Sequence, residues 1–195
     1  MIRRTLCLFV CMLSALSFPS SAGHPVQNIV KNGDFEKFSG DEPVGWETTN
    51  IPKFCTVVTP TTKCHGGKYA AKCEVKNCSG AMIPGMIQQK NIPVKGRSYR
   101  MQFYYLLKSA NGDVGYISME FKNADGSTIR MCEERLTTAK ADFAQFSTQF
   151  SAPSEATHGD LKIALLATAK DGTVHEGSVV IVDDIVLTEV SGEEQ

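Results

Sequence analysis

The side chains that could carry out chemistry do not combine into a catalytic signature. Glu133 and Glu134 form a carboxylate pair, but they lie in a predicted loop without an apolar pocket that would raise a pKa for acid–base catalysis. The motifs of serine hydrolases, zinc peptidases and phosphate-binding loops are absent. A lyase-like convergence of Tyr104, Arg130 and His158 is the remaining enzymatic alternative. The sequence therefore favours a non-catalytic protein.

Five cysteines follow residue 22, and their spacing predicts disulfides rather than a metal site. In an oxidising compartment they can form two disulfides and leave one thiol, which can link two chains into a dimer. The pairs with the shortest loops are Cys55 with Cys64 and Cys73 with Cys78, which leaves Cys132, although sequence does not fix the connectivity. A zinc site is the alternative, but no paired CxxC is present and the four histidines are scattered.

Residues 1–22 have the features of a secretory signal peptide. Arg3 and Arg4 give a basic start, an apolar run occupies residues 5–18, and small residues offer a cleavage site. We therefore expect a secreted protein, extracellular or periplasmic, whose residues 23–195 form one domain. No later stretch approaches the roughly 20 apolar residues of a membrane span. Without the two arginines, acidic residues outnumber basic ones, which does not favour nucleic acid or an anionic membrane as a partner.

Short runs of alternating apolar residues, separated by glycine and Asx turns, predict strands along most of the chain. Asn111–Gly112 is a hairpin signal, and residues 133–142 are the segment that could hold a short helix. Trp46 is predicted to fill the core rather than to form a ligand platform. Strands at this regular spacing indicate an all-β antiparallel sandwich or jelly roll. They are predicted at residues 54–58, 69–75, 87–94, 98–107, 115–122, 128–132, 143–151, 161–168 and 178–187.

The segment NIVKNGDFE (residues 28–36) and the last predicted strand, SVVIVDDIVL (residues 178–187), are expected to meet and close the sandwich. Alternation places Asp183 on the same face as the apolar residues two positions away on either side, so its carboxylate is predicted to point inward. A buried carboxylate needs a cation or several hydrogen-bond donors to offset its desolvation. A calcium ion, backbone N–H groups, or a basic side chain such as Lys68 or Arg97 would each meet this need.

The order of several motifs resembles that of the carbohydrate-binding modules of families 4 and 9, which belong to the galactose-binding-like jelly rolls. The motifs are NIVKNGDFE, PVGW, GGKYAAK, YRMQFYY, GYISMEF, FSTQFSAP and VVIVDDIVL, and they span nearly the whole chain after residue 22. Phe143 stands where family members usually carry a tryptophan. The resemblance implies a non-catalytic module that binds a poly- or oligosaccharide on a sheet face. The alternative is an extracellular structural or adhesive protein that uses the same sandwich for protein contacts.

The same resemblance implies a structural calcium ion between the two ends of the chain. Matched by position, Glu36 and Asp183 would provide carboxylates, and Asp34 and Lys68 would provide backbone carbonyl groups. Oxygen ligands of mixed type suit calcium. His65 stands where one pattern among the relatives has an acidic ligand.

The resemblance further implies that sugar rings stack on aromatic side chains with amides, acids and arginines beside them. Alternation along two predicted strands turns Tyr104 and Tyr116 away from the core. Gln88 and Arg130 lie on strands that could border the same sheet. These four residues are the predicted sugar-binding set, and the alternative is two ordinary half-exposed tyrosines on a solvated sheet.

Overall fold

The computed structural model describes residues 27–48, 56–75, 86–109, 112–137, 141–166 and 176–190, with the backbone alone at residues 56–58. The predicted signal peptide, Cys55, Cys78 and Asn111 lie outside the described residues. The described parts contain strands and no helix, and so no helix in them could cross a membrane. The strands are β1 (Phe38–Ser39), β2 (Glu42–Pro43), β3 (Glu47–Thr48), β4 (Thr56–Thr61), β5 (Ala70–Val75), β6 (Met86–Pro93), β7 (Ser98–Lys108), β8 (Val114–Lys122), β9 (Thr128–Leu136), β10 (Ala144–Ser151), β11 (His158–Leu166) and β12 (Val179–Glu189).

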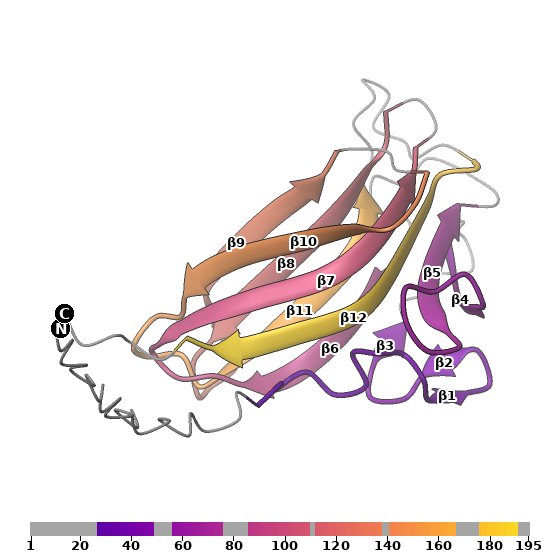
Figure 1. Cartoon of the computed structure of the whole chain (residues 1–195). Coiled ribbons are helices and arrows are strands. Elements are labelled where there is room, and N and C mark those ends of the chain that lie inside the picture. Colours follow the sequence, from indigo (N-terminus) through magenta and orange to yellow (C-terminus); the bar gives the residue numbers. More distant parts are fainter. Residues whose placement is uncertain are drawn as a thin grey trace, which may run out of the picture.

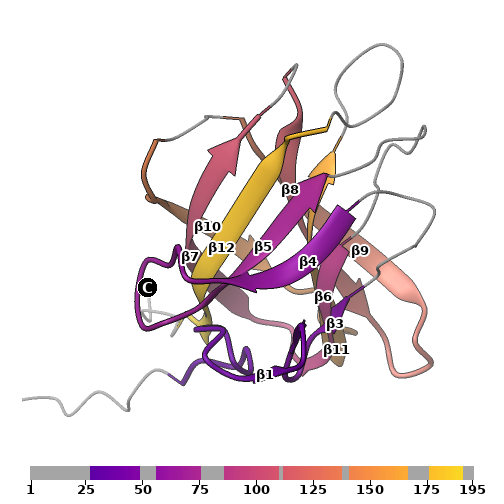
Figure 2. The same cartoon turned by 90° about the vertical axis from the view of Figure 1, so that its right-hand side faces the viewer.

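Two antiparallel five-stranded sheets face each other as a sandwich (Figure 1, Figure 2). The first, called here the β7 sheet, has the strand order β10-β7-β12-β5-β4. The second, called the β8 sheet, has the order β3-β6-β11-β8-β9. β1 and β2 form a separate small hairpin. The predicted all-β antiparallel sandwich is confirmed.

The core lies between the two sheets and follows the predicted alternation of β7 and β8. Its buried residues on these strands are Tyr99, Met101, Phe103, Tyr105 and Leu107 of β7 and Ile117, Met119 and Phe121 of β8. Trp46 is buried beside Phe35, with ring centroids 5.2 Å apart. Its indole N–H donates to the carbonyl oxygens of Lys31 and Asn32, so the polar end of the ring is satisfied. The prediction that Trp46 fills the core is confirmed.

The N-terminal segment, residues 28–36, lies against β12, as the sequence predicted, although it forms turns rather than a strand. The backbone N–H of Ile29 donates to the carbonyl of Leu187 at 3.0 Å, and that of Ile185 donates to the carbonyl of Gly33 at 2.8 Å. The Asn28 side chain donates to the Ile185 carbonyl and accepts from the Leu187 N–H. These bonds join segments about 157 residues apart in sequence and close one end of the sandwich.

β9 corrects the prediction of a short helix over residues 133–142. The strand continues from Thr128 to Leu136 and pairs with β8 along its length, with Ile117 opposite Glu134 and Gly115 opposite Leu136. Residues 133–136 contain good helix formers, but the hydrogen bonds offered by the neighbouring strand override this weak local preference. Glu133 and Glu134 therefore lie on a strand and not in a loop.

The described cysteines are thiols. Cys64, Cys73 and Cys132 are all free, so neither predicted disulfide is present at its described end. Cys73 lies in the core between the sheets, and burial raises its pKa to about 12. It therefore packs there as a small, protonated, apolar side chain. Cys132 is half-buried on β9.

Candidate functional site

The outer face of the β8 sheet brings together Gln88 of β6 and Tyr116 of β8, two of the predicted sugar-binding residues. Both are half-buried. The strand registers align a row of side chains across all five strands, and a second row with Tyr116 lies beside it. The first row consists of Glu47, Gln88, Lys162, Ser118 and Glu133, and the second contains Met86, Ala164, Tyr116 and Arg135.

Hydrogen bonds hold the polar groups of this face in fixed positions. The phenol of Tyr116 donates to Glu133 Oε1 at 2.6 Å, and Gln88 Nε2 donates to Glu47 Oε2 at 3.2 Å. Lys162 is paired with Glu120 on the next strand. Burial, and then the bond to Glu133, raise the pKa of Tyr116, so the phenol stays neutral and remains a donor. The face thus offers one aromatic ring flanked by an amide, carboxylates and an ammonium group.

Glu47, Lys162 and Glu133 are members of this face that the sequence prediction did not include. Alternation alone shows which residues of one strand share a side. It does not show which strands are neighbours or how they are aligned, and these depend on the pairing of β3, β6, β11, β8 and β9. The outward position of Glu120, on the same side of its strand as Tyr116, was the one signal in the sequence for an acidic side chain on this face.

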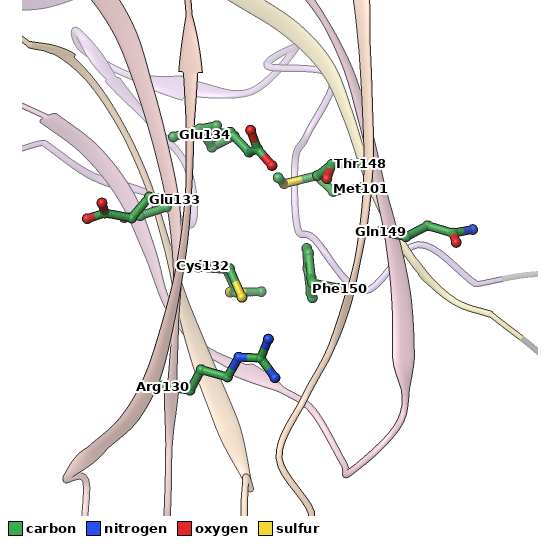
Figure 3. A pocket seen from close by; sticks show the side chains of 11 residues that line it. Met101, Arg130, Cys132, Glu133, Glu134, Thr148, Gln149 and Phe150 are labelled. Atoms are coloured by element: carbon green, nitrogen blue, oxygen red, sulfur yellow. The ribbon is translucent and has the colours of Figure 1, made fainter.

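Arg130 belongs to the same sheet, as expected, but it faces the opposite side. It lies opposite Phe121, which points into the core. Figure 3 shows its guanidinium between β9 and β10, the edge strands of the two sheets, below Cys132 and Phe150. Its Nη1 donates to the carbonyl of Ser151 at 3.3 Å. The structure therefore does not bring Arg130 to Gln88 and Tyr116.

The space that Arg130 enters is a hollow of about 290 Å³ between the sheet edges. Its floor is apolar and includes Met101, Met119 and Phe150, while Arg130 and Glu134 are charged groups at its rim. Glu134 points into the hollow and Glu133 points away from it (Figure 3). A second hollow of about 370 Å³ adjoins it, and shares Arg130, Gln149 and Phe150 with the first.

Tyr104 lies on the β7 sheet and so cannot contribute to a site with Tyr116. Its ring is stacked on that of His65, with centroids 3.4 Å apart and planes 8° apart. His65 also has Phe143 at its edge and bonds Asp184 Oδ2 through Nδ1 at 2.7 Å. One face of the Tyr104 ring is therefore occupied by the protein itself. The lyase alternative is not supported either, because His158 lies on β11 and bonds Thr157, away from Tyr104 and Arg130.

Asp183 is fully buried, as predicted, but on the other side of its strand. The register of β12 shifts between Asp183 and Val186, and Asp184 has a φ of 51°. Before this bulge, Val180 and Val182 face the main core, and Ile181 lies in a small cluster on the outer side. The Asp183 carboxylate is thus covered by the turn at residues 65–69 and not by the opposite sheet. Asp184 contacts the same turn, with Oδ2 3.0 Å from where a Cβ on Gly66 would lie.

The turn at residues 65–69 supplies backbone donors to the two carboxylates of the predicted calcium site. Asp183 Oδ2 accepts the N–H groups of His65 and Gly66 at 2.8 and 3.1 Å. Glu36 Oε1 accepts those of Lys68 and Tyr69 at 2.7 and 3.0 Å. These bonds lower the pKa of Glu36. Burial raises the pKa of Asp183, with the N–H bonds opposing it. Backbone N–H groups, which the sequence left open as an alternative to calcium, are thus partners of Asp183.

The residues around this turn provide some of the oxygen ligands that a hard cation needs. Glu36, Lys68 and Asp183 meet at it, and a Cβ on Gly67, which has a φ of +62°, would lie 2.2 Å from Glu36 Oε1. With Asp184, three carboxylates surround one short turn. Asp34 is exposed in the turn before Phe35. Across the described ranges, no three or more histidine, cysteine, aspartate and glutamate side chains group as a metal site. Any ion here would need backbone carbonyl ligands as well.

A protein-family sequence model described as a carbohydrate binding domain matches residues 27–170. No curated protein matches the chain in sequence.

Several solved structures have a similar fold. The CBM22-1 xylan-binding domain from Paenibacillus barcinonensis Xyn10C aligns with a TM-score of 0.54 and 11% identity, over 86% of this chain and 97% of that one. A cyclase from Fischerella sp. TAU aligns with a TM-score of 0.62 and 14% identity, over 84% and 96%. The enzymatically active domain of bacteriophage CBA120 tailspike protein 4 gives the same TM-score and identity, but this chain spans 21% of its length. At these identities, the likeness is one of fold.

Proposed function

Because the chain belongs to the carbohydrate binding domain family, we propose that it is a secreted, non-catalytic module that binds a poly- or oligosaccharide. The proposed site is the outer face of the β8 sheet. The observation that carries it is an aromatic ring bonded to a carboxylate, Tyr116 with Glu133, on the same face as the amide of Gln88, which lies across β11. A sugar ring has an apolar face that packs on an aromatic ring and hydroxyl groups that bond amides and acids.

The charged groups of this face support an uncharged, hydroxyl-rich ligand. Glu47 is paired with Lys90, with 2.7 Å between Oε2 and Nζ, and Lys162 is paired with Glu120. Cations and anions therefore alternate, and no single sign of charge dominates the face. Such pairs can exchange bonds with sugar hydroxyl groups without leaving a buried charge alone. The proposal includes secretion, which rests on residues 1–22.

We also propose a structural calcium ion at the turn of residues 65–69, with Glu36 and Asp183 as carboxylate ligands and Asp34 and Lys68 as carbonyl ligands. Support comes from the excess of carboxylates around this turn and from the space that Gly67 leaves for Glu36. Calcium accepts this mixture of oxygen ligands. The ion would stabilise the fold and would not take part in sugar recognition, since the turn lies on the β7 sheet.

The test is a binding titration of the secreted chain against soluble neutral and acidic polysaccharides. Replacement of Tyr116 by Ala should weaken binding by roughly 1–3 kcal/mol, because a stacked ring would lose its platform. Gln88→Ala should weaken it less. The matched control is Tyr104→Phe, a tyrosine on the other sheet, which should leave binding unchanged. If the unaltered chain binds no polysaccharide at millimolar concentration, the proposal fails.

A structural or adhesive role is the second candidate, and a specific observation favours it. Ile129 and Met131 of β9 are 40% and 47% exposed, and so are among the few large apolar side chains that reach solvent in the described ranges. They lie on an edge strand, where protein contacts commonly form. Met131 lies opposite Glu120, on the same side of the sheet as Glu133, so the two roles would use adjoining parts of one face.

A further inference from the structure

β9 is a long strand whose side chains are exposed on both faces. It occupies one end of the β8 sheet, and its outer edge has no strand partner within the described residues. Of its nine residues, all but Cys132 and Leu136 are exposed. Figure 1 and Figure 3 show it beside β10 but in the other sheet. Such an edge carries unpaired N–H and C=O groups and readily pairs with another strand unless something blocks it.

The sequence of β9 is complementary to itself when it is reversed. After a bulge at residues 128–130, the strand is regular from Arg130 to Leu136, and residues 130–134 form its self-complementary part. If two copies pair in antiparallel fashion about Cys132, Arg130 of each copy lies opposite Glu134 of the other. The two Cys132 residues then face each other, and Met131 lies opposite Glu133. Opposite charges on directly opposed residues stabilise a pair of strands.

Other registers lack this match. Opposed residues of antiparallel strands point to the same face of the sheet. For the two sheets to continue as one, the even-numbered residues of one copy must therefore lie opposite even-numbered residues of the other, and odd opposite odd. A centre at Glu133 or at Glu134 places like carboxylates opposite each other, and a centre at Arg130 opposes two arginines. A centre at Met131 leaves Arg130 opposite Cys132 and Glu134 opposite Thr128. Only the centre at Cys132 pairs both charges.

We propose that two copies of the chain associate through antiparallel pairing of β9, centred on Cys132. The contact is isologous, since each copy gives the same strand. It extends the β8 sheet to ten strands, and the outer faces with Gln88 and Tyr116 lie on the same side of it. Arg130 and Glu134, which sit at the rim of the hollow between β9 and β10, become partners across the interface. The contact is small compared with stable interfaces, so the dimer dissociates on dilution.

The first test measures the mass of the secreted chain by analytical ultracentrifugation under reducing conditions, over a range of concentrations. A monomer–dimer equilibrium is expected. Arg130→Glu and Glu134→Arg should each raise the dimer dissociation constant about tenfold or more, because the two-fold axis doubles every change. The double variant should restore dimerisation, which a merely structural role of either residue would not do. Circular dichroism shows that each variant is folded.

The second test uses oxidised glutathione to trap the contact. Two Cys132 thiols lose two protons and two electrons to form an interchain disulfide, while glutathione disulfide is reduced to two glutathione molecules. The dimer should appear on a non-reducing gel, persist in Cys64→Ser, and disappear in Cys132→Ser. A chain that stays monomeric at all concentrations overturns the proposal, as does a double variant that fails to recover. The inward charges of β9 would then serve to block edge pairing. None of these outcomes depends on sugar binding.

Discussion

The imidazole ring of His65 lies flat on the phenol ring of Tyr104, at a centroid separation of 3.4 Å. This contact joins the turn at residues 65–69 to the outer face of β7. The same turn covers Asp183 through the N–H groups of His65 and Gly66. Tyr104 therefore belongs to the packing that fastens this turn to the β7 sheet, and its contribution should be one of stability.

Replacement of Tyr104 by Ala should lower the free energy of unfolding without changing sugar binding. Loss of an aromatic pair costs about 0.5–1.5 kcal/mol in addition to the buried area. Tyr104→Phe keeps the ring, and should therefore have a small effect. Thermal melts and a polysaccharide titration of the same samples give both quantities. Weaker sugar binding in Tyr104→Ala at unchanged stability would place the ligand on the β7 sheet instead.

Replacement of Gly33 by Ala should destabilise the fold strongly. A Cβ at this position would lie 2.1 Å from the carbonyl oxygen of Ile185, which belongs to the central strand of the β7 sheet and cannot move freely. Gly40→Ala is the control, because its Cβ would meet no atom within 4 Å and only its φ of +64° is unfavourable. We expect the control to cost about 1–2 kcal/mol, and Gly33→Ala to cost more. Urea titrations would measure both, and equal costs would contradict the close approach.

Asp160 should make stability depend on pH in the acid range. Its Oδ2 lies 2.6 Å from Lys122 Nζ, and its Oδ1 accepts the N–H of Asn91 at 3.0 Å. Burial alone would raise its pKa, but the Lys122 and Asn91 bonds outweigh this and the pKa is lowered. The folded state therefore binds the proton less readily than the unfolded chain. The stabilising contribution is present above the ordinary pKa of aspartate and is lost as the pH falls through the lowered value.

Replacement of Asp160 by Asn should accordingly lower the melting temperature at neutral pH and flatten its decline in acid. Lys122→Met offers the matched comparison, because it removes the cation and leaves a buried carboxylate. Its loss of stability should be greater at neutral pH than in acid, where the carboxylate is protonated. Thermal melts between neutral pH and about pH 2 would measure both effects. Parallel pH profiles for the three proteins would exclude this role for Asp160.

Removal of calcium should lower the melting temperature of the chain. Calcium that binds only the folded state stabilises it by about 2.7 kcal/mol when the free ion is a hundredfold above its dissociation constant. Without the ion, the raised pKa of Asp183 means that stability is lost as the pH rises through that value, and calcium should offset this loss. Asp183→Asn should abolish the response to a chelator. If excess chelator leaves the melting temperature of the wild type unchanged, the backbone N–H groups are the partners of Asp183 and no calcium is bound.

The sequence predicted the class of fold because alternation is a local property. The inward residues of β7 and β8, such as Phe103 and Phe121, were assigned correctly from their spacing alone. The partition of strands between the two sheets is not local, and so Tyr104 and Tyr116 could not be separated in advance. Arg130 illustrates the same limit at closer range, because its side of β9 depends on the register with Phe121.

Asp183 shows how one extra residue changes a prediction from periodicity. The spacing of the apolar residues on either side of it predicts that they point to one face. The bulge at Asp183–Val186 instead turns the residues before it and after it to opposite faces. Ile181 packs in the small outer cluster, and Leu187 packs in the main core. No pattern in the sequence marks this bulge. The burial of Asp183 was predicted correctly, but its side chain was predicted to point into the core, whereas the turn at residues 65–69 covers it.

The last described strand of the chain is the middle strand of its sheet. β12 lies between β7 and β5 and is also bonded to the N-terminal segment. As the chain leaves the ribosome, β4 and β5 therefore remain separated from β7 and β10 until β12 has emerged. Contacts of such long sequence separation form slowly, and the waiting strands expose edges to other nascent chains. A message cut short before β12 would thus yield a chain with a divided sheet, which is a substrate for chaperones or proteolysis rather than a smaller working domain.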